Sequence, residues 1–276
     1  LFLLQVLLTF LDALFNPALE DESALRLVVR RSTSLADLIP MSYKDKIARV
    51  PGVKYVVPMQ WANGIYREQA NFFANFAVEP DHLFDVYSEQ VVEPEALKAF
   101  LNDRTAAIAG EDLMDRFGWK IGDHITLLGT MYPVDLEFKI VGTYRSSRYQ
   151  NMFYFRYDYF SEALGGFNEV GSFAIMAEDA DAVPRIAEEV DALFHNSAAE
   201  TKTETEKAFV LGFMSMLGNV KTIVGSIALV VVFTMLLVSV STMSMAIRER
   251  LREVSILRAI GYSNRTVFLL ILGEAL

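Results

Sequence analysis

The longest apolar run in the sequence lies near its C-terminal end. Residues 222–247 contain no Asp, Glu, Lys, Arg or His over 26 positions, and Lys221 and Arg248 flank them. A helix of this length rises about 39 Å, whereas the hydrocarbon core of a bilayer is about 30 Å thick. The buried helix of a soluble core rarely runs so far without a charge, so the pattern predicts a membrane-spanning helix.

Shorter apolar runs stand at both ends of the sequence. Residues 1–11 carry no charged side chain, and residues 266–276 carry only Glu274. The first run lacks the basic start and the small-residue cleavage site of a secretory signal peptide. We therefore interpret residues 1–15 as the outer end of a truncated first transmembrane helix and residues 266–276 as the start of a truncated third one. We expect the sequence to be part of a longer chain.

Strand and helix patterns alternate through residues 16–207. The predicted strands lie at residues 23–31, 53–59, 72–78, 105–109, 124–128, 136–144 and 171–177, and the predicted helices at residues 41–50, 111–117 and 181–196. The pattern predicts an α+β extracytoplasmic domain of two lobes, in which a βαβ-type, porter-like lobe receives a small β-rich lobe inserted at about residues 94–157. Residues 208–247 follow as an amphipathic stalk and the second transmembrane helix.

Local signals support two of these helices. Gly118 follows the helix at residues 111–117 and suits a left-handed C-terminal cap. Pro184 suits the first turn of the helix at residues 181–196. This second helix carries its expected apolar stripe at Ile186, Val190, Leu193 and Phe194.

Aromatic side chains gather in residues 152–160. Their members include Phe153, Tyr154, Phe155, Tyr157 and Tyr159. One interpretation is a strand packed between the two lobes, and the other is an exposed surface for an outer partner or an apolar cargo. The sequence leaves both open.

Composition and charge narrow the class of protein. Hydrophobic residues make up 53% of the 276, charged residues 22%, and the net charge is −10. Such an acidic chain lacks the basic footprint of a nucleic-acid-binding protein. There is no cysteine, which excludes disulfides, thiolate metal sites and cysteine nucleophiles.

The distribution of arginine predicts the orientation in the membrane. Five arginines lie in residues 248–265 after the long apolar run, whereas only Lys221 closely precedes it. Positive charge collects on the cytoplasmic side of membrane proteins. We therefore expect residues 248–265 to be cytoplasmic and residues 16–220 to be extracytoplasmic.

Motifs for chemistry are not found in the sequence. The three histidines, His82, His124 and His195, are far apart and lack metal-ligand spacing. The sequence contains neither a G-x-S-x-G nucleophile elbow nor a G-x-x-x-x-G-K-[ST] phosphate loop. We expect no catalytic residue, no metal site and no bound cofactor in this chain.

The cytoplasmic stretch after the apolar run carries the most specific pattern. It is predicted to be a helix that ends at Gly261, with Asn264 as the cap of the next helix. On its own, this stretch is explained as a basic anchor that fixes the topology. It also has the form R-E-R-x-R-E-x-x-x-L-R-A-x-G, whose members include Arg248, Glu249, Arg250, Arg252, Glu253, Leu257, Arg258 and Gly261.

This pattern, following an apolar span, resembles the cytoplasmic helix of the MacB/FtsX-type ABC transporter permeases. Residues 104–110, 118–123 and 141–144 are similar to short turns of the family's periplasmic core domain. The resemblance implies a permease subunit in which the residues of that motif contact a separate or fused cytoplasmic ATPase, which binds ATP and Mg²⁺. It also implies a multi-pass protein of the inner (cytoplasmic) membrane, in contact with lipid and paired with a second permease copy as a homodimer or heterodimer. A periplasmic adaptor remains open as a further partner.

Other classes of protein share parts of this pattern. A two-span membrane sensor with an extracytoplasmic ligand-binding domain has the same topology up to Arg248, but it normally continues into a soluble coiled coil or effector. A membrane-anchored enzyme would need an active-site motif. The sequence leaves the role within the family open among efflux, lipoprotein or peptide export, and regulation of cell-wall hydrolases, and the size of the outer domain favours the first two.

Overall fold

The computed structural model describes residues 24–146, 150–216, 220–249 and 251–267, together with residues 5 and 269. The chain divides into two compact units. One, the α/β unit, is Ala18–Phe213, and the other, the helical unit, comprises Leu1–Pro17 and Met214–Leu276.

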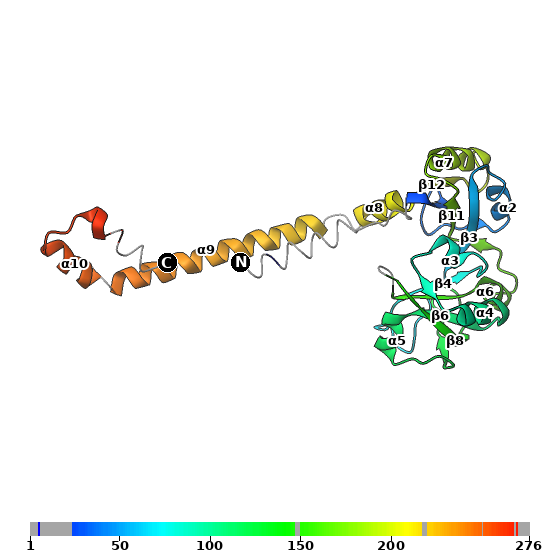
Figure 1. Cartoon of the computed structure of the whole chain (residues 1–276), viewed down its shortest axis with the longest axis horizontal. Helices are drawn as coiled ribbons and strands as arrows, with labels where there is room; N and C mark the ends of the chain where they lie inside the picture. Colours follow the sequence, from blue (N-terminus) through cyan, green and yellow to red (C-terminus); the bar gives the residue numbers. More distant parts are fainter. Residues whose placement is uncertain are drawn as a thin grey trace. The chain divides into compact units, whose positions relative to one another are not determined.

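Strands of the α/β unit form one large mixed sheet (Figure 1). In the described part of the chain, the order of its ten strands is β12-β1-β11-β3-β4-β9-β6-β8-β5, with β7 also paired to β8, while β2 and β10 form a separate pair. The strands are β1 Arg26–Arg31, β2 Ile39–Pro40, β3 Val53–Trp61, β4 Ala74–Val78, β5 Val91–Val92, β6 Ala106–Gly110, β7 His124–Leu127, β8 Leu136–Arg145, β9 Met152–Arg156, β10 Glu169–Val170, β11 Ser172–Ala177 and β12 Thr201–Thr205.

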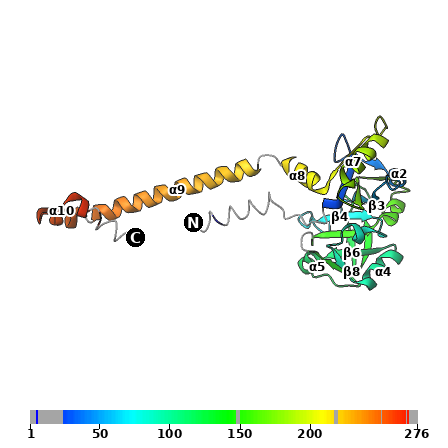
Figure 2. The same cartoon turned by 45° about the horizontal axis from the view of Figure 1, so that its top comes forward.

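Helices flank this sheet (Figure 2). They are α2 Tyr43–Ile47, α3 Leu83–Val86, α4 Pro94–Asn102, α5 Glu111–Phe117, α6 Tyr157–Ala163 and α7 Ala182–Leu193. The helix α8, Glu206–Met216, follows β12 along the chain and continues past the end of the α/β unit at Phe213. The views agree that α2 and α7 lie beside β3 and β11, whereas α4 lies beside β6 and β8.

Alternation along the strands divides the core between the two faces of the sheet. Phe153 and Phe155 of β9 belong to one buried cluster, and Tyr154 between them belongs to the other. Ile186 of α7 packs in the first cluster, and Phe100 of α4 packs in the second. Because both faces are covered there, β6, β9 and β11 are buried over nearly their whole length, whereas β7 and β8 alternate between buried and more exposed residues.

The mixed α/β fold predicted for the extracytoplasmic domain is confirmed. Each predicted strand is present within a few residues, and β3 pairs with β4, with Met59 opposite Val78. Residues 94–157 are β-rich, and their strands continue the main sheet through parallel pairing of β9 with β4. The predicted cap at Gly118 is also confirmed, since its φ is 65° and its N–H bonds to the Met114 carbonyl.

Two sequence-based details are wrong. Residues 152–160 are not one strand, because β9 ends at Arg156 and α6 begins at Tyr157. Leu193 does not belong to the apolar stripe of α7, since 51% of its surface is exposed at the last residue of the helix. Ile186, Val190 and Phe194 are buried as expected.

An ion-pair network on β12 makes the stability of the α/β unit depend on pH. The Glu204 carboxylate accepts hydrogen bonds from Arg30 at 2.9 Å and from Lys202 at 2.9 Å. Burial raises the pKa of Glu204, but the two cations outweigh it and hold this pKa below its ordinary value of 4.5. A carboxylate whose pKa is lower in the folded than in the unfolded state stabilises the fold at pH values above the unfolded-state pKa. This contribution is lost as the pH falls through the folded-state pKa.

We therefore expect Glu204→Gln to lower the melting temperature at pH 7, and we expect this difference to shrink as the pH falls below 4.5 and through the lowered pKa of the wild-type carboxylate. Thermal unfolding followed between pH 7 and pH 3 measures this difference. Glu188→Gln on the exposed side of α7 is the matched control. An equal loss of stability at every pH would show that Glu204 acts through packing instead.

The helical unit contains the predicted membrane span. Here α9 runs over Val220–Glu249, and α10 over Leu251–Ala259. Within α9, Gly225–Met245 is the segment long and apolar enough to cross a bilayer, with a mean hydropathy of 2.3 and no burial inside the protein. The partial spans predicted at residues 1–15 and 266–276 lie outside the described residues, apart from residues 5, 266, 267 and 269.

Candidate functional site

A tight helix end closes the motif of residues 248–261. The N–H of Gly261 bonds to the carbonyl of Arg258 at 3.1 Å, and the N–H of Tyr262 bonds to the carbonyl of Leu257 at 3.1 Å. This pair of bonds is a Schellman motif, which needs a left-handed residue, and Gly261 has a φ of 101°. The predicted helix stop at Gly261 is confirmed.

The chain re-enters helix directly after this stop. The Ser263 hydroxyl accepts a hydrogen bond from the N–H of Thr266 at 3.3 Å, so Ser263 is the cap and the expected cap at Asn264 is wrong. Asn264 instead accepts a hydrogen bond from the Arg258 guanidinium through its side-chain oxygen. Arg258 thus ties the end of α10 to the start of the next helical turn.

The members of the motif lie around the junction of α9 and α10. Arg248 and Arg258 are exposed, and Leu257 is half-buried. Glu249 is the last residue of α9. Arg252 and Glu253 lie in the first turn of α10, and Arg250 is outside the described residues.

The aromatic residues predicted as a possible outer surface are buried. Phe153, Tyr154 and Phe155 have no exposed surface, and Tyr157 keeps 6%. Only Tyr159 is half-buried, and its ring contacts Phe138 edge-on at 5.7 Å. The interpretation as a partner or cargo surface is therefore corrected to a packed strand and helix, because β9 lies inside a sheet that is covered on both faces.

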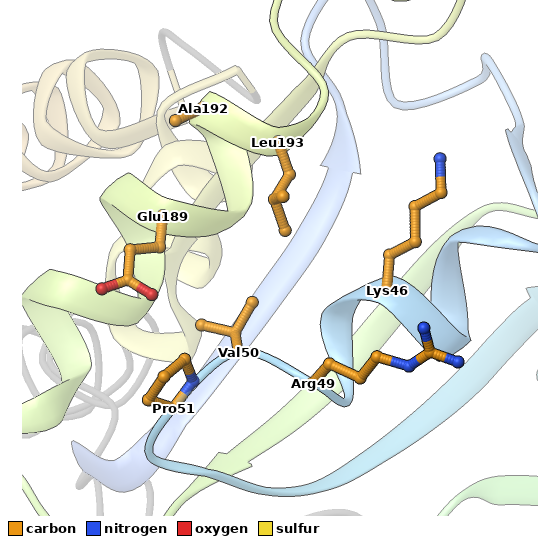
Figure 3. A pocket seen from close by; sticks show the side chains of 7 residues that line it. All are labelled: Lys46, Arg49, Val50, Pro51, Glu189, Ala192 and Leu193. Atoms are coloured by element: carbon orange, nitrogen blue, oxygen red, sulfur yellow. The ribbon is translucent and has the colours of Figure 1, made fainter.

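An open groove of about 520 Å³ lies between α2 and α7 (Figure 3). It is lined by Lys46, Arg49, Val50, Pro51, Glu189, Ala192 and Leu193. Figure 3 shows the two cations on the α2 side and Glu189 on the α7 side. This mixed charge around a shallow apolar floor selects no particular ligand.

The described residues hold no cluster of three or more His, Asp or Glu side chains with the geometry of a metal site. Each histidine instead lies near a single carboxylate at the surface. His82 contacts Asp85 at 2.9 Å, and His124 contacts Glu137 at 2.9 Å.

A buried charge cluster is the main feature of the α/β unit that sequence reasoning missed. The Arg26 Nε donates to a Glu206 carboxylate oxygen at 2.7 Å, and its two terminal nitrogens donate to the two Glu89 oxygens at 2.7 and 2.8 Å. Arg26 Nη1 also donates to the Val86 carbonyl at 2.9 Å, and the Tyr87 ring lies 4.8 Å from the guanidinium. We call these three ionic residues, Arg26, Glu89 and Glu206, the Arg26 junction.

Burial and charge act in opposite directions on this junction. The Arg26, Glu89 and Glu206 side chains keep only 4%, 7% and 9% of their surface. Burial lowers the pKa of Arg26, but hydrogen bonds and charge from the two carboxylates outweigh it and raise this pKa above its ordinary value. No sequence signal marks the cluster, because Arg26 and Glu206 are 180 residues apart.

The comparisons with known proteins agree with this fold. Residues 2–193 match the MacB-like periplasmic core domain, and residues 225–276 match the FtsX-like permease C-terminal domain. The extracellular domain of the noncanonic ABC-type transporter YknZ from Gram-positive bacteria superimposes with a TM-score of 0.51 at 15% identity, over 65% of this chain and 99% of that one. The periplasmic region of MacB from Actinobacillus actinomycetemcomitans gives 0.52 at 13% identity, over 69% and 94%. A search of curated protein sequences gives no match.

An α/β domain joined to an apolar helix and a tight basic turn defines a membrane subunit of a transporter rather than an enzyme. The chain belongs to the MacB/FtsX family of ABC transporter permeases, since the core-domain match alone covers well over half of it. ATP hydrolysis in this family belongs to a partner subunit.

Proposed function

We propose that this permease relays ATP-driven movement from a cytoplasmic ATPase to the α/β domain, for efflux or for export of lipoproteins or peptides. Closure of two ATPase subunits around ATP and Mg²⁺ displaces the cytoplasmic turn formed by α10 and Gly261. The transmembrane helix then carries this displacement to the extracytoplasmic side. Residues 16–220 are extracytoplasmic and residues 248–265 cytoplasmic in this arrangement.

The observation that carries the proposal is the unbroken helix α9. It runs for 30 residues, and a helix of that length spans about 45 Å, so it extends beyond a hydrocarbon core of about 30 Å. A continuous helix moves nearly as a rigid rod. Its cytoplasmic end leads directly into α10, whose tight closure at Gly261 suits a contact that must pass on force.

The proposal also sets the expected partners. They are a cytoplasmic ABC ATPase, a second permease copy and membrane lipid, and a periplasmic adaptor would direct the complex to tripartite efflux. Coupling between two sites is reciprocal and ordinarily amounts to about 1–3 kcal/mol. Engagement of cargo outside must therefore change ATP hydrolysis inside.

Arg258→Glu tests the relay. The substitution reverses an exposed charge and removes the hydrogen bond that joins α10 to Asn264. In the complete permease with its ATPase, we expect the rate of ATP hydrolysis supported by the permease to fall by about fivefold or more, in the range of ordinary coupling energies. Co-purification and a coupled ATPase assay measure assembly and rate.

Lys98→Glu, which makes the same charge change at an exposed position on α4, is the control. It should leave assembly and rate unchanged. Should Arg258→Glu behave like Lys98→Glu in both measurements, the cytoplasmic turn is not the contact with the ATPase and the relay is wrong.

A further inference from the structure

The Arg26 junction joins three segments that are distant in the sequence. Arg26 is the first residue of β1, and Glu206 is the first residue of α8, the helix that leads along the chain toward the transmembrane helix. Glu89 lies in the connection between α3 and β5, and the Val86 carbonyl belongs to the last residue of α3. One guanidinium therefore holds the start of α8 and the α3–β5 connection together.

The topology shows what the junction adds. The start of α8 is already attached to β1 through β12, since Thr205 lies opposite Leu27. The strands β12 and β1 lie at one end of the row of strands in the sheet, whereas β5 lies at the other end. The path from β12 to β5 along the sheet crosses seven other strands, and Arg26, which lies on the first of them, reaches the α3–β5 connection without passing through the other six.

Energetics indicate that the junction serves more than stability. A buried ion pair is often no more stabilising than apolar residues of the same volume, because desolvation offsets the attraction. An arginine–carboxylate pair differs from such apolar residues in its directionality, since the planar guanidinium fixes the angle at which each carboxylate approaches. Arg26 uses both terminal nitrogens on Glu89 and Nε on Glu206, so it orients the two segments relative to one another.

We infer that the Arg26 junction is the positioning device that passes movement of α8 directly to the α3–β5 connection, and so to both ends of the sheet at once. The inference rests on the proposed relay. Without the junction, α8 remains attached to β1 through β12, and its movement reaches residues 83–92 only indirectly, through the sheet and the packing of α3 on β3 and β11.

Hydrogen–deuterium exchange of the complete permease with its ATPase tests this inference. Exchange is measured with and without Mg²⁺-ATP and vanadate, which traps the ATPase after hydrolysis. In the unsubstituted protein we expect both α8 and residues 83–92 to change exchange on trapping. In Arg26→Met the change in α8 should persist, and the change in residues 83–92 should fall by about fivefold or more.

Three further variants serve as controls for Arg26→Met. Arg26→Lys keeps the charge but loses the planar fork, so it should give an intermediate response. Arg104→Met removes an arginine that pairs with Glu162 at the surface and should behave as wild type. Arg26→Met alone leaves two carboxylates buried together, which can destabilise the fold. The triple variant Arg26→Met, Glu89→Gln, Glu206→Gln removes all three charges and should therefore fold normally. It should still lose the response at residues 83–92.

The outcomes separate the two proposals. A trapping response at residues 83–92 that survives in the triple variant overturns the role of the junction and leaves the relay standing. If trapping changes neither α8 nor residues 83–92 in the unsubstituted protein, the relay itself is overturned, and the role of the junction with it.

Discussion

Phe155→Ala is expected to destabilise the α/β unit by about 3–5 kcal/mol, the usual result of removing a buried phenylalanine ring. Phe155 has no exposed surface and lies in the centre of β9. Its ring centroid is 4.5 Å from that of Phe138 and 6.1 Å from that of Phe160. Rigid strands on both sides prevent collapse of the cavity, so the cost should lie in the upper part of this range.

The two tryptophans make this measurable in the intact chain. Trp61 and Trp119 are the only tryptophans in the sequence, and both lie in the α/β unit. Their fluorescence during denaturant unfolding therefore reports on this unit alone, even when the membrane helices are present. The free energy of unfolding follows from the midpoint and slope of the transition.

Phe72→Ala is the matched control, because the same atoms are removed from a ring that is 51% exposed and touches only Trp61 edge-on among the aromatic rings of the described residues. Its cost should be about 1 kcal/mol or less. If the two variants cost the same, Phe155 is not part of the core, and the aromatic residues would again be candidates for an exposed partner surface.

Gly142→Ala is expected to disturb the packing of α4 on β8. A Cβ added at Gly142 would lie 2.3 Å from the Cβ of Ala96, well inside van der Waals contact. Overpacking of this kind typically costs about 1–3 kcal/mol. The same fluorescence-detected unfolding measures the loss, since Phe100 of α4 packs in the same buried cluster as Tyr154 of β9.

The neighbouring alanine offers a rescue. Ala96→Gly alone should cost about 1 kcal/mol, because glycine lowers helix propensity. In the double variant the clash is absent, so the combined loss should be smaller than the sum by about 0.5–3 kcal/mol. Gly212→Ala on α8, where an added Cβ meets nothing within 4 Å, should cost nothing. Strict additivity of the first two substitutions would show that helix and strand do not approach as closely as described.

Local patterns were sufficient for several parts of this protein. A charge-free run of 26 residues needs no tertiary partner to be recognised as a membrane span. The helix stops at Gly118 and Gly261 follow from the left-handed backbone that glycine adopts without strain. The family resemblance rested on the same kind of signal, a contiguous motif at residues 248–261.

Other predictions failed where two neighbouring residues compete for one position. Asn264 and Ser263 are both good helix caps by residue type, and only the three-dimensional turn decides that Ser263 caps while Asn264 binds Arg258. Leu193 fits the helical period of α7, but its neighbour Phe194 takes the buried position and stacks on Tyr43, while Leu193 lines the open groove between α2 and α7.

The sequence by itself determined the membrane helix, the mixed α/β character of the outer domain and the family, because hydrophobic length, residue period and a contiguous motif are local properties. Only the tertiary structure decided that the aromatic residues of β9 are core and that Arg26 meets Glu89 and Glu206. Burial depends on which layers cover a strand, and an ion pair across 180 residues depends on the whole path of the chain between its partners.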